Sequence, residues 1–199
     1  MISQRQIKER ENRKEQILKG ALLVFKEKGI EKSTMDEIAK QSDFGKASLY
    51  YYFSSKEEIF IELLDRGWKM IWESIEPVIH DRDHPKDTFI SSLNIIGGLV
   101  RDDRVLFEFL FTAPKALPSN QDGKKSDWKN YQNKMYTVLQ SLLEEGIEKK
   151  EFPKMRSDLL MRAIGGLFHG LFFLGNEKPM SRKTMEKFIT SFIGNYGNS

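Results

Sequence analysis

Residues 33–59 read STMDEIAKQSDFGKASLYYYFSSKEEI, and this stretch decides the fold. It opens with two hydroxyl residues, each followed three positions later by an acid, which is the pattern of an N-terminal capping box. Residues 42–45 then interrupt the helical spacing with turn-forming residues around one phenylalanine. A second short helix is predicted from Lys46 to Tyr52, with Leu49 and Phe53 facing inward. The stretch therefore predicts two short helices joined by a tight turn.

Longer amphipathic helices are predicted on both sides of this stretch. Upstream, apolar residues recur at helical spacing from about Glu9 to Lys28, and Gly29 can close that helix in a left-handed conformation. Downstream, the cap at residues 54–58 opens a long connecting helix over about 55–79. Two short helices between two longer ones indicate helix-turn-helix geometry, in which the second short helix enters the major groove of DNA.

The remainder of the chain shows helical spacing throughout. Residues 88–111 predict one or two helices, divided near Asp102, and residues 112–126 contain prolines and a glycine that indicate a loop. Three further helices are expected over about 127–150, 157–174 and 180–196. Because no segment alternates apolar and polar residues as a strand does, we expect an all-α fold with an N-terminal three-helix bundle that contains the helix-turn-helix.

The composition excludes several classes of protein. The 199 residues are 39% hydrophobic and include no cysteine, so disulfides, thiolate metal sites and cysteine nucleophiles are ruled out. No apolar run approaches the roughly 20 residues of a membrane span, and the charged N-terminal segment lacks the apolar centre of a signal peptide. We therefore expect a cytoplasmic protein that contacts no membrane.

Basic residues are concentrated at the N-terminal end. Residues 1–56 hold 12 Lys and Arg against 8 Asp and Glu, whereas the whole chain carries a net charge of only +3. This asymmetry favours nucleic acid as a partner of the first quarter of the chain. An alternative interpretation is that charge runs such as residues 8–14 only solvate one face of a helix.

The second short helix carries a polar outward face. Because Leu49 and Phe53 occupy its inward positions, Lys46, Ser48, Tyr50 and Tyr51 are left pointing outward. Phenolic hydroxyls that donate to DNA phosphates would explain exposed tyrosines. The alternative is that these rings pack half-buried with their hydroxyls in water, which suits the third tyrosine better than the other two.

These motifs resemble the TetR family of bacterial regulators. The family pattern of a hydroxyl-rich cap, Ile-Ala, a turn and then Lys-x-x-Leu-Tyr-Tyr-Tyr/His-Phe-x-x-Lys-Glu-x-Leu appears here as residues 33–39 and 46–59. The resemblance implies a DNA-binding domain over residues 1–56, and a ligand-binding and dimerisation domain over residues 57–199 that begins with the connecting helix. Beyond about Trp68 it is a resemblance of architecture only.

The resemblance also implies roles for single residues. Thr34 would bind a phosphate through its hydroxyl and backbone amide. Lys46 and Ser48 would reach base edges or nearby phosphates. Tyr50, Tyr51 and Lys56 would contact the DNA backbone. Gly45 departs from the family, which often has Ser or Thr there, and Asp43 replaces the usual turn glycine. The candidate DNA-binding residues are Ser33, Thr34, Gly45, Lys46, Ser48, Tyr50, Tyr51 and Lys56.

Family members use the second domain for a ligand cavity and for a dimer interface made by the last two helices. The candidate dimer residues here are Gly166, Gly170, Phe173, Phe188 and Phe192. The candidate ligand-binding residues are Trp68, Trp72, Phe107, Phe111, Trp128, Tyr131 and His169. The alternative is that these aromatic side chains are core residues and that the histidine is a satisfied core residue.

The function expected from the resemblance is that of a sequence-specific transcriptional regulator, a repressor that leaves its operator when a small, mostly apolar effector binds. Its partners would be double-stranded operator DNA, an unidentified small-molecule effector and a second copy of the chain, and no cofactor or metal is expected. An enzyme is a weaker alternative, because the metal-like cluster at residues 80–84 lies in a linker between prolines. A helical interaction module that does not bind DNA is another. The sequence leaves open the operator, the effector, the regulated genes and the choice between repression and activation.

Overall fold

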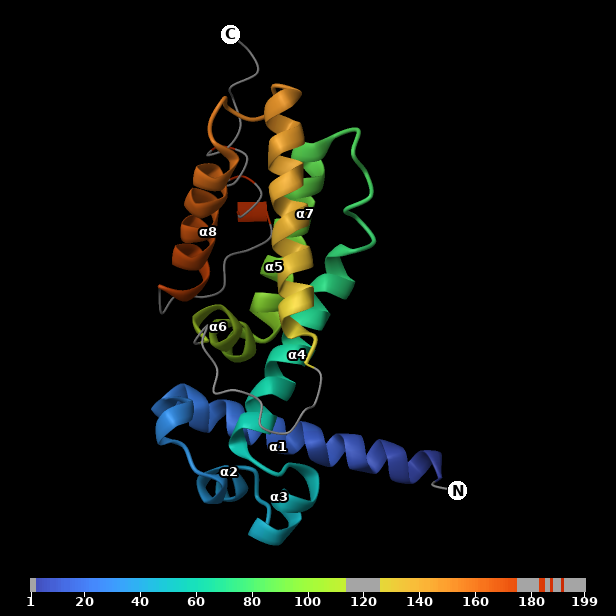
Figure 1. The fold of residues 1–199 in the computed structure, drawn as a ribbon, viewed down its shortest axis with the longest axis vertical. Helices are drawn as coiled ribbons and strands as arrows, with labels where there is room; N and C mark the ends of the chain where they lie inside the picture. The colour runs from blue at the N-terminus through green and yellow to red at the C-terminus, as the bar shows by residue number, and fades with distance from the viewer. Residues whose placement is uncertain (1–2, 114–125, 175–182, 185–186, 188–190, 192–199) are drawn as a thin grey trace. The chain divides into compact units, whose positions relative to one another are not determined.

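The computed structural model describes residues 3–113, 126–174, 183–184, 187 and 191, and the regular structure in these residues is entirely α-helical (Figure 1). The all-α prediction is therefore confirmed. The helices are α1 (Gln4–Lys32), α2 (Met35–Gln41), α3 (Lys46–Tyr52), α4 (Lys56–Ile75), α5 (Pro85–Asp102), α6 (Arg104–Thr112), α7 (Trp128–Glu148) and α8 (Ser157–Phe173). Of the helix predicted at 180–196, residues 183–184, 187 and 191 are described and are helical, whereas Phe188 and Phe192 lie outside the described residues. None of the described helices is both long and apolar enough to cross a membrane.

The chain packs as two compact units. The first contains Met1–Gly67 and Val105–Trp128, and the second contains Trp68–Arg104 and Lys129–Ser199. Helix α4 contributes its first part to one unit and its last part to the other. The boundary predicted after residue 56 separates a DNA-binding domain from a ligand-binding domain, and it stays a prediction. The boundary between the two compact units lies farther along the chain, between Gly67 and Trp68 inside α4.

Helix α1 is longer than its apolar spacing predicts. It begins at Gln4 because Ser3 and Gln6 form a reciprocal capping box, a signal that the periodicity does not contain. Its buried face runs from Ile17 to Phe25. Gly29 adopts φ 73° and ψ 164°, a conformation that glycine alone adopts readily, and it interrupts α1 where the sequence predicted the end of the helix. The helix resumes after this glycine and ends at Lys32 instead.

The turn between α2 and α3 forms as its residue types predict. Asp43 has a positive φ of 59°, and the amide of Phe44 donates to the carbonyl of Ala39 at 2.9 Å. Gly20 of α1 lies directly against this turn, because a Cβ atom there would stand 2.3 Å from the Oγ of Ser42 and 2.9 Å from its backbone nitrogen. A glycine is therefore needed where α1 meets the end of α2.

Helix α6 packs in the first unit, although the sequence suggested a place in the second domain. The Phe109 ring lies 4.9 Å from the ring of Phe60 on α4 and 6.3 Å from the ring of Phe25 on α1. Nearby, the ammonium of Lys26 is 2.8 Å from a carboxylate oxygen of Glu108. These contacts fix α6 to the same unit as α2 and α3.

The start of α7 is also held in the first unit. The carboxylate of Asp65 on α4 accepts hydrogen bonds from the backbone amides of Asp127 at 3.0 Å and Trp128 at 2.6 Å. Burial raises the pKa of Asp65 above its ordinary value, and the two amides only partly offset that effect. A side chain of α4 thus satisfies amides that the first turn of α7 leaves open.

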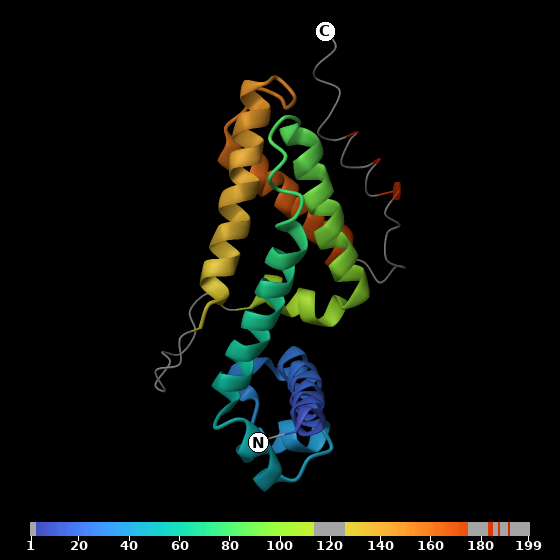
Figure 2. The same cartoon turned by 90° about the vertical axis from the view of Figure 1, so that its right-hand side faces the viewer.

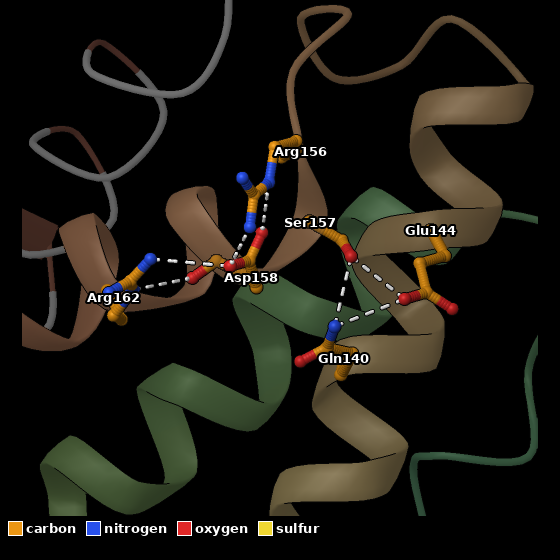
Figure 3. Close-up of polar contacts among 6 residues, drawn as sticks. All are labelled: Gln140, Glu144, Arg156, Ser157, Asp158 and Arg162. Carbon is orange, nitrogen blue, oxygen red and sulfur yellow. Dashed lines mark hydrogen bonds and ion pairs between the residues drawn. The ribbon is translucent and has the colours of Figure 1, made fainter.

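The second unit gathers α5, α7 and α8 (Figure 2). Its core includes Phe89 and Phe152, whose rings lie 5.8 Å apart edge to face. At the other end of α7, Ser157 donates to Glu144 at 2.8 Å and accepts from Gln140 at 3.0 Å, which ties the first residue of α8 to α7 (Figure 3).

Candidate nucleic-acid interface

The outward face of α3 is exposed as predicted. Leu49 is fully buried, whereas Tyr51 is 70% exposed and Tyr50 is 46% exposed. Lys46 and Ser48 are exposed on the same short helix. Four polar side chains therefore stand in solvent on one seven-residue helix whose apolar side is anchored in the core.

Five of the predicted DNA-binding residues meet in one shallow hollow. It has a volume of about 400 Å³ and is lined by Ser33, Thr34, Lys46, Tyr50 and Lys56 together with neighbouring residues. Ser33 is the C-cap of α1 and Thr34 the N-cap of α2, whereas Lys46 and Tyr50 belong to α3 and Lys56 begins α4. The fold thus brings together residues that are far apart along the sequence.

Lys46 on this face forms an ion pair with Asp36 of α2. The ammonium of Lys46 lies 2.9 Å from a carboxylate oxygen of Asp36, and this hydrogen bond raises the pKa of the lysine. Both side chains are more than 60% exposed, at 62% and 64%. A contact of Lys46 with DNA would therefore require it to release Asp36, a residue that the sequence had marked only for capping.

The capping box of α2 uses the groups through which Thr34 was expected to bind phosphate. Its backbone amide and its hydroxyl each donate to Glu37 Oε2 at 3.0 Å. Lys28 also bonds to Glu37, and the two partners, with Lys28 the larger cause, lower the pKa of that carboxyl. A phosphate at Thr34 would have to displace the Glu37 carboxylate.

Two of the predicted contacts need correction. Lys56 donates from its Nζ to the carbonyls of Ile30 at 2.8 Å, Glu31 at 3.1 Å and Ser33 at 2.9 Å, so all three of its hydrogens are used at the end of α1. Ser33 is only 2% exposed, and its hydroxyl donates to the carbonyl of Gly29. Both residues close α1, and neither presents a free polar group to DNA.

The remaining residues of the predicted face behave differently from one another. Gly45 is exposed and serves as the N-cap of α3 without a side-chain hydrogen bond. Tyr52 is half-buried, with its ring 6.3 Å from that of Phe44 and 5.1 Å from that of Tyr51. The packing interpretation that was kept open for the tyrosines therefore applies to Tyr52.

The predicted ligand-binding residues do not all fall in one unit. Phe107, Phe111 and Trp128 belong to the first unit, and Trp68, Trp72, Tyr131 and His169 belong to the second. The most buried are Trp68 and Phe107, each 1% exposed, and Trp128, 7% exposed. His169 is half-buried, with its ring 5.3 Å from that of Phe173. Burial of this kind fits core residues as well as cavity walls, and the ligand assignment stays a prediction.

The small-residue face of α8 is open among the described residues. A Cβ atom at Gly166 would meet nothing within 4 Å, and one at Gly170 would meet only the side chain of Leu174 at 3.9 Å. Leu159 and Leu174 on the same helix and at its end are 48% and 77% exposed. Phe173, a further dimer candidate, is half-buried.

Residues 17–63, which span most of α1, all of α2 and α3 and the start of α4, match the family model of the TetR-type bacterial regulatory proteins. These residues form a DNA-binding domain of the TetR type. The chain is a TetR-type DNA-binding transcriptional regulator.

Relatives of this regulator support the assignment along most of the chain. The HTH-type transcriptional regulator YfiR of Bacillus subtilis is 27% identical over 191 residues, which cover 85% of this chain and 84% of YfiR. IcaR of Staphylococcus aureus, a negative transcriptional regulator of the biofilm operon icaADBC, is 32% identical over 98 residues, which are 49% of this chain and 46% of IcaR. The crystal structure of AibR in complex with isovaleryl coenzyme A and operator DNA shares the fold, with a TM-score of 0.75 at 14% identity over 92% of this chain and 98% of AibR.

Proposed function

We propose that this regulator is a ligand-responsive repressor, which binds its operator as a homodimer and leaves it when a small, mostly apolar effector binds. The observation that carries the proposal is the exposed face of α3, where Lys46, Ser48, Tyr50 and Tyr51 stand in solvent on a helix anchored by buried Leu49. IcaR is a negative regulator, which supports repression. AibR was crystallised with both operator DNA and a coenzyme A thioester, which supports a response to a ligand.

The four residues divide into two roles in this proposal. Tyr50 and Tyr51 donate their hydroxyls to phosphate oxygens, which positions the helix on the duplex without reading sequence. Lys46 and Ser48, nearer the N-terminal end of α3, reach base edges in the major groove or phosphates beside it. Lys46 gives up its bond with Asp36 in the complex.

Dimerisation in this proposal uses the open face of α8 around Gly166 and Gly170. One short reading helix makes too few contacts for operator-level affinity, and a two-fold pair supplies a second half-site. Light scattering on the purified protein at micromolar concentration is expected to give the mass of a dimer. A monomer at that concentration contradicts this part of the proposal.

The response to an effector depends in this proposal on α4, a continuous helix whose first part lies in the unit with α2 and α3 and whose last part lies in the other unit. The tilt of such a helix can transmit a change from one unit to the other. A ligand shifts operator affinity only by as much as it prefers one state over the other, which is typically about 5- to 150-fold, and the operator must weaken the ligand by the same factor.

Thermal unfolding with candidate effectors tests the response to a ligand. Isovaleryl-CoA and a long-chain acyl-CoA serve as probes, and coenzyme A alone serves as the control for the polar part of the molecule. A probe that binds only the folded state raises the melting temperature. Titrating that probe with and without operator DNA then measures the coupling. Equal affinities in both titrations remove the ligand-responsive part and leave a regulator that binds DNA constitutively.

A further inference from the structure

The N-terminal extension of α1 has no place in a hydrophobic core. Residues 3–13 are all exposed, and they precede Ile17, where both the buried face of the helix and the matched family segment begin. Figure 1 shows this part of α1 running on past α3. A helix that is polar on all sides gains little from burial and needs other interactions to persist.

The extension is stabilised by ion pairs between its acidic residues and arginines. Glu9 pairs with Arg13 at 3.0 Å, and Arg66 of α4 reaches both Glu15 at 2.7 Å and Glu11 at 3.6 Å. All three acids of residues 4–16 are therefore paired with arginines. Residues 4–16 hold five cations, of which Arg13 alone takes part in these pairs, so the other four are not neutralised by them.

One of those cations lies against the outward face of α3. The guanidinium carbon of Arg10 is 5.8 Å from the centre of the Tyr51 ring, and the ammonium of Lys14, one turn later, is 5.6 Å from the centre of the Phe53 ring. Tyr51 itself is 70% exposed. Arg10 therefore stands beside the phenol that is proposed to donate to a DNA phosphate.

We infer that Arg10 binds the DNA backbone together with Tyr51, so that the extension of α1 is a phosphate-binding arm outside the family's helix-turn-helix segment. The planar guanidinium can stack on the phenol ring and still direct N–H groups at a phosphate oxygen, which Lys in the same place would do only as a point charge. The inference rests on the proposed DNA-binding role of α3. A phosphate contact carries no sequence information, so it should act equally on operator and non-operator duplexes.

The test compares Arg10→Ala with Lys8→Ala. Lys8 is an exposed cation of the same extension and lies about 160° around the helix from Arg10, so the two variants lose the same charge on opposite sides. Circular dichroism and thermal unfolding establish that both variants fold. Anisotropy titrations then use a duplex selected from a random pool by the wild-type protein and an unrelated duplex, each over a series of salt concentrations.

Arg10→Ala is expected to weaken binding to both duplexes by about five- to tenfold at 0.1 M salt. It should also lower the slope of log K against log salt by about 0.9 for each phosphate that is no longer neutralised. Lys8→Ala should change the affinity and the slope much less. The double variant with Tyr51→Ala should lose less than the product of the single losses, because both residues serve one phosphate. Equal effects of Arg10→Ala and Lys8→Ala overturn the inference and leave the proposed function standing. Failure of the wild-type protein to bind any duplex overturns the proposed function instead.

Discussion

Replacing Lys56 separates the role that the structure gives this residue from the role that the sequence predicted. Lys56→Met keeps the apolar stem and removes the three hydrogen bonds to the carbonyls of Ile30, Glu31 and Ser33. Hydrogen bonds from a charged group contribute roughly 1.5–3 kcal/mol each, but these are not additive, and water replaces part of them at a half-buried site. We expect a loss of about 2 kcal/mol in the free energy of unfolding, or about 4–8 °C in melting temperature for a chain of this size.

Two measurements on this variant check the reasoning. Thermal unfolding should show the fall in melting temperature, and Lys46→Met, which removes a lysine 62% exposed in its surface pair with Asp36, should change it little. In DNA titrations the salt slope should fall for Lys46→Met and stay the same for Lys56→Met. A Lys56→Met protein with an unchanged melting temperature and a reduced salt slope would refute the structural role and restore the phosphate contact.

Three further predictions concern Gly20, Asp36 and Asp65. Gly20→Ala places a Cβ atom 2.3 Å from the Oγ of Ser42 and 2.9 Å from its backbone nitrogen, so urea unfolding should show a loss of about 1–3 kcal/mol from overpacking; an unchanged midpoint would mean that the turn yields freely. Asp36→Asn removes the carboxylate that holds Lys46, so DNA titrations should show tighter binding to operator and non-operator duplexes alike, and weaker binding would instead assign Asp36 a positioning role. The raised pKa of Asp65 means that the folded state holds the carboxyl proton more tightly than the unfolded state does, so the free energy of unfolding falls as pH rises from about 3.8 through the folded pKa. Urea titrations at successive pH values should show that Asp65→Asn lacks this part of the fall. Parallel curves of unfolding free energy against pH for both proteins would contradict the prediction.

Local signals predicted the helix-turn-helix well. The bounds of α3, its buried Leu49 and its exposed Tyr50 and Tyr51 follow from helical spacing within a few residues. The break at Gly29 and the turn at Asp43 follow from the backbone conformations that these residue types tolerate. Each of these features depends on neighbours in the sequence, which is why a single sequence is enough to predict it.

The features that the sequence did not predict depend on contacts between distant segments. Lys56 reaches carbonyls 23 to 26 residues earlier, so its spacing from Lys46 could not distinguish a helix-closing lysine from one that binds phosphate. Asp36 bonds to Lys46 across the turn, ten residues away. The place of α6 beside α1 and α4 depends on Phe109 meeting Phe25 and Phe60, and periodicity shows that a helix has an apolar face without showing what covers it.

The central claim is that the outward face of α3 binds duplex DNA. The most direct measurement is the affinity of the protein for a duplex selected by the wild type, compared with that of the double variant Tyr50→Ala with Tyr51→Ala, over a range of salt concentrations. Both side chains are exposed, so the variant should fold, which circular dichroism checks. The wild type should bind with log K falling linearly with log salt, and the variant should bind weakly to every sequence. A folded variant that keeps the wild-type affinity would contradict the claim.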